Sequence, residues 1–438
     1  MNERNKQIHT RNKIKSKLQL IFFFISLIIF FFTLFYFINF VKNWKEERKE
    51  LLDYIKNNKI NAVLNELSNE EDLSSYSTNN SEIIKIILTP EEQFDLQIDR
   101  KIHDMSLSEK VAGLFFLTPE NLTGVKTSTQ AGNATKYALE QYPIGGIIYF
   151  EKNIQSAEQI SKMIDNSKKY CKYPLFIGIE EEGGSISQIS KAELTETFPS
   201  AAEIGSSGNI KEAYTVGTQI GVSLFNLGFN VNFAPVVDIA SIEQSIMKDR
   251  SYGNNAKIVS YYAISMMNGL HDSNIISCLK HFPGIGSSIN NSNEYPIIIE
   301  KSAIELRTEE FQVFKAGIKS GVNMIMVSHA LVPALDENNI PSFLSKTIVT
   351  DILRKELKFE GIIITDYLNV PSLTNLYNSK EIAISALNAG CDMLLNPENF
   401  KEAHEGIVDA VLNGTIPEKQ IDESLKRIYR VKYKNLKK

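Results

Sequence analysis

Charged side chains that can bind a polyhydroxylated ligand stand at or just after short apolar runs in this sequence. Glu180 follows one run, Lys280 and His281 close a second, and Asp366 follows a run of isoleucines, while Arg250 lies in a loop. Such groups make charge-assisted hydrogen bonds to a neutral polyol, and a rigidly held aspartate can also act as a nucleophile. We therefore expect one small-molecule site, provided that the fold brings these residues together.

The segments that must position these candidate site residues alternate between short apolar runs and amphipathic stretches. The candidate strands are Val111–Leu117, Gly146–Tyr149, Leu175–Ile179, Val231–Pro235, Ile276–His281, Met324–Val327, Gly361–Thr365 and Asp392–Leu395. The candidate helices are Ser156–Tyr170, Ile210–Leu227, Ile258–His271, Ala303–Ser320, Leu344–Leu357, Glu381–Ala389, Phe400–Leu412 and Glu418–Tyr433. Strands that alternate with helices predict a parallel sheet, and about eight such units predict an α/β fold of the (β/α)8 TIM-barrel type.

A barrel of this kind carries its site at the C-terminal ends of the strands and in the loops after them. The candidate residues all lie in such places, as do Asp238 and His329, although His329 also fits an ordinary histidine at the edge of the core. A doubly wound open sheet is the alternative fold. No GxGxxG motif follows the first strand, so a dinucleotide site has little support.

The N-terminal part of the chain predicts a membrane anchor. Residues 1–19 form a basic tail, and residues 20–41 are apolar and uncharged over the length that spans a bilayer. The basic excess before this span places the N-terminus in the cytoplasm and the rest of the chain outside. A cleaved signal peptide is the alternative, although no small-x-small cleavage site follows. Residues 42–92 are typical of a stalk, and residues 93–438 form the predicted barrel domain.

Composition argues against several classes of partner and cofactor. The net charge of −5 at pH 7 disfavours nucleic acid as the main partner. Cys171, Cys278 and Cys391 form no CxxC pair, so neither a metal site nor a disulfide framework is expected. No organic cofactor is implied by any motif.

Four motifs resemble glycoside hydrolase family 3, in its single-domain β-N-acetylhexosaminidase branch. KHFPGIG at Lys280–Gly286 is similar to the family's Lys-His-Phe-Pro-Gly-His-Gly, and IGIEEEGGSISQI at Ile177–Ile189 is similar to its Asp-x-Glu-Gly-Gly-Arg-Val-x-Arg segment. NFAPVVDI at Asn232–Ile239, with DRSYG in the following loop, and GIIITDYL at Gly361–Leu368 are also similar. The resemblance extends over residues 104–432 and implies a carbohydrate substrate or ligand.

The resemblance implies a role for each candidate residue. Asp366 matches the nucleophile that attacks the anomeric carbon in a retaining mechanism, although its local sequence fits a helix N-cap equally well. Lys280, His281 and Arg250 match residues that bind sugar hydroxyls, and Glu180 stands where the family has a binding aspartate. A buried ion-pair network around the barrel rim is the structural alternative for this set.

The chain departs from the family in the loop that should supply the acid/base. The family's loop carries an Asp-Ser-His unit, whereas Ser287–Pro296 contains neither His nor Asp, and Asn291 and Asn293 take their places. Asparagine cannot donate a proton near neutral pH, and general acid/base catalysis contributes about 10²–10⁴-fold. Glu294 is the carboxylic acid left in the loop, and it is either a substitute acid or an ordinary exposed glutamate.

These observations predict one of three functions. The first is a β-N-acetylhexosaminidase-like glycosidase that removes terminal amino sugars, for example from peptidoglycan fragments outside the membrane. The second is a catalytically impaired pseudoenzyme that binds carbohydrate without turning it over, which the missing dyad favours. The third is a scaffolding protein, against which the retained polar rim counts.

Overall fold

The computed structural model describes residues 89–289 and 296–436. They belong to one compact unit, which begins at Thr89. The predicted tail and anchor, and the stalk as far as residue 88, lie outside the described residues, as do Asn291, Asn293 and Glu294. Among the described residues, no helix is both long and apolar enough to cross a membrane.

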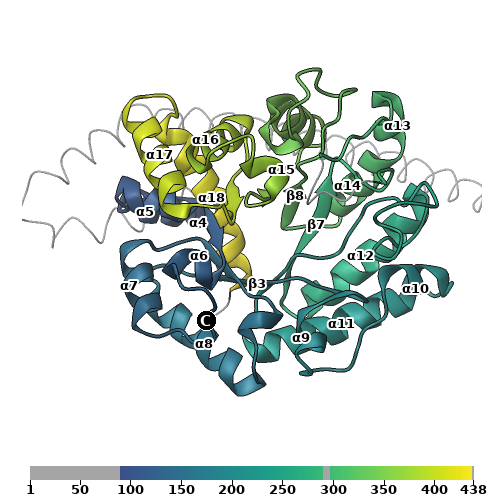
Figure 1. The fold of residues 1–438 in the computed structure, drawn as a ribbon, viewed down its shortest axis with the longest axis horizontal. Helices are drawn as coiled ribbons and strands as arrows, with labels where there is room; N and C mark the ends of the chain where they lie inside the picture. Colours follow the sequence, from purple (N-terminus) through teal and green to yellow (C-terminus); the bar gives the residue numbers. More distant parts are fainter. Residues whose placement is uncertain (1–88, 290–295, 437–438) are drawn as a thin grey trace, which may run out of the picture. The chain divides into compact units, whose positions relative to one another are not determined.

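Eight parallel strands close into a barrel, as the sequence predicts, and helices surround them (Figure 1). Around the barrel they follow one another in chain order, and the last strand pairs with the first. The strands are β1 (Phe115–Leu117), β2 (Gly146–Ile148), β3 (Phe176–Ile179), β6 (Val231–Asn232), β7 (Ile276–Phe282), β8 (Met324–Val327), β9 (Ile362–Tyr367) and β10 (Met393–Leu395). Closure leaves the barrel without an edge strand, so the alternative open sheet is wrong.

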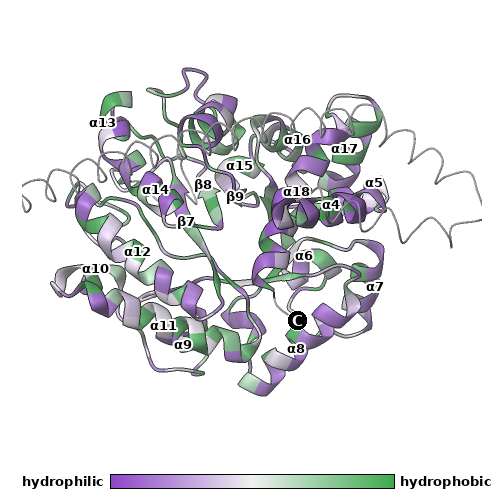
Figure 2. Ribbon diagram, turned by 180° about the vertical axis from the view of Figure 1, so that it is seen from behind, coloured by the Kyte–Doolittle hydropathy of each residue, from purple (hydrophilic) through white to green (hydrophobic). Residues whose placement is uncertain are grey.

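The helices lie close to their predicted ranges, with one interruption. The longer ones are α4 (Pro90–His103), α7 (Asn133–Gln141), α8 (Ala157–Tyr170), α11 (Ile210–Leu227), α12 (Ala256–Asp272), α14 (Glu310–Lys319), η3 (Thr347–Glu356), α16 (Ser379–Ala389), α17 (Phe400–Leu412) and α18 (Glu418–Asn435). The shorter ones are α5 (Leu107–Ala112), α6 (Pro119–Thr123), η1 (Glu151–Asn153), α9 (Gln188–Lys191), α10 (Ala201–Ser206), α13 (Ala303–Thr308), η2 (Ser342–Leu344) and α15 (Pro371–Thr374). The predicted helix Ala303–Ser320 breaks at Glu309, whose φ of −118° and ψ of −81° are not helical. Helices such as α8 and α12 mix hydrophilic and hydrophobic residues along their length (Figure 2), as expected of helices with one face on a core.

The first strand is shorter than its apolar run suggests. Val111 ends up in α5, and β1 begins only at Phe115. Ser106 starts α5 with a capping box, in which its hydroxyl accepts a hydrogen bond from Glu109 N at 3.3 Å and its backbone N donates to Glu109 Oε2 at 2.9 Å. Because this capping box starts a helix at Leu107, the first apolar residues of the run are helical and the strand begins after them.

Aromatic side chains fill the interior of the barrel beneath the rim. The ring of Phe116 stacks on Phe176 with centroids 6.2 Å apart and meets Phe233 edge-on at 5.1 Å. A Cβ atom added at Gly146 or Gly178 would lie 2.7 Å from the Phe116 ring, so only glycine leaves room for it. The interior is therefore a packed core, and the polar residues are left at the strand ends above it.

A small hairpin follows β3 and was not predicted from the sequence. Its strands are β4 (Glu181–Gly183) and β5 (Ile186–Ser187), which pair antiparallel. Side chains alternate along an extended segment, so Glu181 turns away from its two neighbours. Its carboxylate accepts hydrogen bonds of 2.6 and 2.9 Å from backbone amides at the start of α9, whereas Glu180 and Glu182 both contact β7.

The first and last described helices pack together. Arg430 of α18 pairs with Asp95 of α4, with Nε 2.7 Å from Oδ1. Because α4 begins at Pro90, residues 90–92, which the sequence assigns to the stalk, are part of the compact unit.

Candidate active site

Lys280, near the end of β7, is fully buried with its ammonium group between two carboxylates. Its Nζ lies 2.7 Å from Glu180 Oε1 and 2.7 Å from Glu182 Oε1. Burial alone lowers the pKa of Lys280, but the two carboxylates outweigh it, so the net pKa is raised and the ammonium stays charged. The lysine thus fixes the chain after β3 against β7.

Arg250, in the loop after β6, binds both carboxylate oxygens of Glu182. Its Nε and Nη2 donate to the two carboxylate oxygens, each at 2.8 Å. Burial alone raises the pKa of Glu182, but Lys280 and Arg250 lower it by more, so the net pKa is about 2. Glu182 is therefore an anion shared by two cations, which agrees with a structural role for this residue.

Asp366 lies in β9, and the residue is 8 % exposed. The Tyr367 backbone N donates to Oδ1 at 2.8 Å, and His329 Nδ1 lies 2.9 Å from Oδ2. Burial raises the pKa of Asp366, but His329 and then His281 lower it more, so its net pKa lies well below the ordinary range. The N-cap alternative is wrong, because the next helix, α15, has Val370 as its N-cap residue.

His281 is oriented by a buried carboxylate. Its Nδ1 lies 2.7 Å from Oδ2 of Asp238, which is fully buried and also accepts a hydrogen bond from Ile285 N at 2.8 Å. A histidine whose Nδ1 is engaged in this way presents Nε2 to its other neighbours. His281 can therefore bind a ligand hydroxyl through Nε2.

Tyr367 feels the charges of both groups of the polar rim. Burial, followed by the charges of Glu180 and Asp366, raises the pKa of Tyr367 well above its ordinary value. The phenol therefore stays protonated and can donate a hydrogen bond. Its ring lies 6.1 Å from that of Phe150, which follows β2.

The structure brings the predicted residues together in two linked groups. Glu180, Arg250 and Lys280 share one ion-pair cluster, while Asp366 and His281 interact electrostatically. Glu294 lies outside the described residues. The sequence singled out Asp238 and His329 only as polar residues at strand ends and did not single out Tyr367. Their positions at a strand end or a few residues beyond it were the available signal.

Two features bear on catalysis and on metal binding. Among the described residues, the ionisable side chains that lower the pKa of Asp366 are those of His329 and His281, and neither is a carboxylic acid. Within the same residues, no cluster of three or more His, Cys, Asp or Glu side chains could hold a metal ion.

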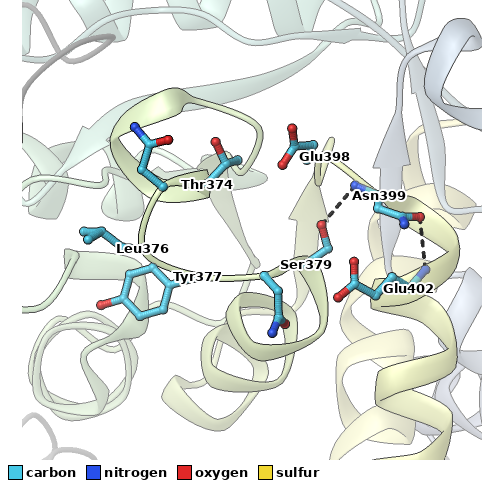
Figure 3. A pocket seen from close by; sticks show the side chains of 9 residues that line it. Thr374, Leu376, Tyr377, Ser379, Glu398, Asn399 and Glu402 are labelled. Atoms are coloured by element: carbon cyan, nitrogen blue, oxygen red, sulfur yellow. Dashed lines mark hydrogen bonds between the residues drawn. The ribbon is translucent and has the colours of Figure 1, made fainter.

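A polar pocket of about 560 Å³ lies among the segments around the N-termini of α16 and α17 (Figure 3). Polar groups of this pocket form hydrogen bonds at the starts of the two helices. Asn399 N donates to Ser379 Oγ at 2.9 Å, and Glu402 N donates to Asn399 Oδ1 at 3.2 Å. None of the predicted site residues lines this pocket.

Comparison with known proteins gives related sequences and folds. Beta-hexosaminidase A of Pseudoalteromonas piscicida is 29 % identical over 326 residues, which are 68 % of this chain and 54 % of that protein. The chain thus spans about half the length of that relative. Beta-hexosaminidase of Haemophilus influenzae is 29 % identical over 286 residues, covering 63 % of this chain and 78 % of the relative.

The fold matches a solved structure of the same kind. The glycoside hydrolase family 3 β-N-acetylglucosaminidase of Paenibacillus sp. superimposes with a TM-score of 0.70 and 28 % identity, over 76 % of this chain and 63 % of that one. The family described as "Glycosyl hydrolase family 3 N terminal domain" matches residues 97–431. The sequence motifs, the closed barrel and this match agree, and the chain belongs to glycoside hydrolase family 3.

Proposed function

We propose that the chain is a β-N-acetylhexosaminidase-like glycoside hydrolase that acts on terminal amino sugars with retention of configuration. The observation that carries this proposal is Asp366, a buried and ionised carboxylate at the rim of the barrel with each oxygen in contact with a neighbour. The relatives called beta-hexosaminidase support the choice of an amino sugar.

The chemistry takes two displacements at one carbon. Asp366 attacks the anomeric carbon, the bond to the aglycone oxygen breaks, and that oxygen takes up a proton. Water then attacks the same carbon, the ester bond to Asp366 breaks, and the sugar leaves with its original configuration. Glu180, Arg250, Lys280 and His281 bind the sugar hydroxyls in both steps.

The first displacement lacks the family's proton donor. Asn291 and Asn293 replace the Asp-His dyad, and neither amide can protonate a leaving group. We therefore propose that turnover is confined to substrates whose leaving group departs without a proton, unless Glu294 acts as the acid. General acid catalysis contributes about 10²–10⁴-fold, which sets the size of the expected defect.

A second candidate function rests on the same substitution. The rim binds carbohydrate without hydrolysis, in which case Asp366 and the ion-pair cluster form a binding site alone. Asn291 and Asn293 favour this candidate, because they remove the group that most glycosidic leaving groups require.

Two aryl glycosides separate the candidates. The 2,4-dinitrophenyl N-acetyl-β-glucosaminide should be hydrolysed much faster than the 4-methoxyphenyl analogue, and proton NMR should show the β-anomer of the free sugar first. An α-anomer formed first would contradict the nucleophile. Saturable sugar binding, with no release of either phenol above background, would establish the second candidate.

We also propose that residues 20–41 anchor the chain in the cell membrane, with the barrel outside, where peptidoglycan fragments provide terminal amino sugars. The uncharged apolar run and the basic tail before it support this placement. Protease added to intact cells should digest the barrel from outside, and protection of the barrel until the cells are lysed would contradict the placement.

A further inference from the structure

His329 lies two residues after the end of β8 and beside the predicted nucleophile. The residue is 6 % exposed, and its Nδ1 lies 2.9 Å from Asp366 Oδ2. Neither ring nitrogen makes a well-formed hydrogen bond to a described residue. This contact is an ion pair only when the ring is protonated, and in that form it lowers the pKa of the aspartate.

The Nε2 atom of the same ring is buried and has no hydrogen-bond partner among the described residues. Buried polar atoms without partners are rare in native proteins, and each one calls for a physical explanation. Two other histidines show the ordinary situation: His281 pairs with Asp238, and His404 of α17 contacts the Ser108 carbonyl oxygen at 2.9 Å. His329 differs because its Nε2 has no hydrogen-bond partner among residues 89–289 and 296–436.

We propose that His329 links the nucleophile to the bound sugar. Nδ1 positions Oδ2 of Asp366, and Nε2 makes a hydrogen bond to a polar group of the ligand. In the neutral ring with its proton on Nδ1, the nitrogen beside the acceptor-only carboxylate, Nε2 is a hydrogen-bond acceptor. The matching groups on the ligand are a sugar hydroxyl or an acetamido N–H. This inference rests on the proposed role of Asp366.

Substitutions of His329 can remove its two ring nitrogens separately. In His329→Asn the side-chain amide can take the place of Nδ1 but cannot reach the position of Nε2. In His329→Gln the amide can reach the position of Nε2 but leaves Nδ1 unreplaced. His329→Phe removes both, and His404→Asn serves as a control for loss of a buried histidine outside the rim. Thermal unfolding of each variant shows whether it folds.

The assay is the time course of labelling of the full-length chain, in detergent, by 5-fluoro-N-acetylglucosaminyl fluoride. It yields a dissociation constant for the reagent and a rate constant for formation of the glycosyl-enzyme. We expect His329→Asn to bind the reagent about tenfold more weakly at a nearly unchanged rate constant, the effect of one lost hydrogen bond. His329→Gln should bind normally and react about tenfold more slowly, and His329→Phe should show both defects.

The outcomes separate this inference from the proposed function. Folded His329→Phe that labels with the rate constant and the affinity of the wild type would overturn the inference and leave Asp366 as the nucleophile. Wild-type protein that never labels would overturn the proposed function. In that case calorimetric titration with N-acetylglucosamine still decides the Nε2 contact, because weaker binding by His329→Asn supports it and equal binding overturns it.

Discussion

Arg250 holds Glu182 through two hydrogen bonds of 2.8 Å, although the two residues come from loops after different strands of the barrel. Lys280 also contacts the same carboxylate, with its Nζ 2.7 Å from Oε1. This shared anion ties together the chain after β3, the loop after β6 and strand β7. The geometry of the ligand-binding rim therefore depends on a residue that need not touch the ligand.

Glu182→Gln should lower the free energy of unfolding by about 3 kcal/mol, because it leaves the buried Lys280 and the half-buried Arg250 with one carboxylate fewer. Urea unfolding measures the change. The matched control is Asp351→Asn, which breaks the exposed pair with Lys355 at 2.8 Å and should change stability by about 0.5 kcal/mol or less. Equal effects of the two substitutions would show that the buried cluster contributes no special stability.

Because of the Glu182 carboxylate, the free energy of unfolding should also depend on pH in the acidic range. Its pKa is about 2 in the folded chain and 4.5 in the reference state, so its contribution is complete above pH 4.5 and is lost as the pH falls through 2. Between those values, wild-type protein should lose about 3 kcal/mol more than Glu182→Gln does. Urea titrations at a series of pH values test this, and parallel pH profiles would contradict it.

Lys432 of α18 should make stability rise with pH in the alkaline range. The residue is buried, donates to the Pro174 carbonyl oxygen at 2.6 Å and lies 4.8 Å from the centre of the Phe176 ring. Burial lowers its pKa from 10.5 to about 7, so between those values the unfolded chain binds more protons than the folded one.

The comparison with Lys432→Met isolates this residue from the other titrating groups. From pH 7 to pH 10, the wild type should gain about 3 kcal/mol of stability relative to the methionine variant. Chemical denaturation at both pH values gives the difference. A stability difference that does not change with pH would mean that the ammonium reaches solvent in the folded chain.

Restoring the missing dyad should restore acid catalysis. Asn291→Asp combined with Asn293→His places the family's residue types at the matching positions. We expect a gain of about 10²–10⁴-fold on a glycoside with a poor leaving group and little gain on the 2,4-dinitrophenyl glycoside. Asn290→Asp with Ser292→His adds the same groups one position earlier and is the control. A larger gain from the control would contradict the assigned register.

The fold could be predicted because each strand and helix leaves its own pattern of apolar residues in a short stretch of sequence. Each strand of the barrel is a short apolar run followed by a helical stretch, and Met324–Val327 was placed to the residue. The boundary of β1 could not be predicted from hydrophobicity, since a capping box at Ser106 competes with the run. The packing of Phe116 against Gly146 and Gly178 was also out of reach, because it depends on which side chains of neighbouring strands turn inward.

The sequence predicted which residues belong to the site better than it predicted which of them contact one another. Strand ends identified Lys280 and Asp366, because the C-terminal ends of barrel strands share one face. The contact of His329 with Asp366 could not be distinguished from an ordinary core histidine, since both place the residue after β8. The sequence likewise left open whether Glu180 and Lys280 bind a ligand or each other, and the structure shows that they bind each other.

The most direct test of the account is to map the covalent adduct on the wild-type full-length chain after incubation with 5-fluoro-N-acetylglucosaminyl fluoride. The reagent has a good leaving group, so it bypasses the missing acid catalyst and tests the nucleophile alone. Mass spectrometry of the digested protein should place one sugar on the peptide that contains Asp366, and Asp366→Asn should remain unlabelled. An adduct on another residue, or no adduct from protein that binds the sugar, would contradict the assignment of Asp366 as the nucleophile.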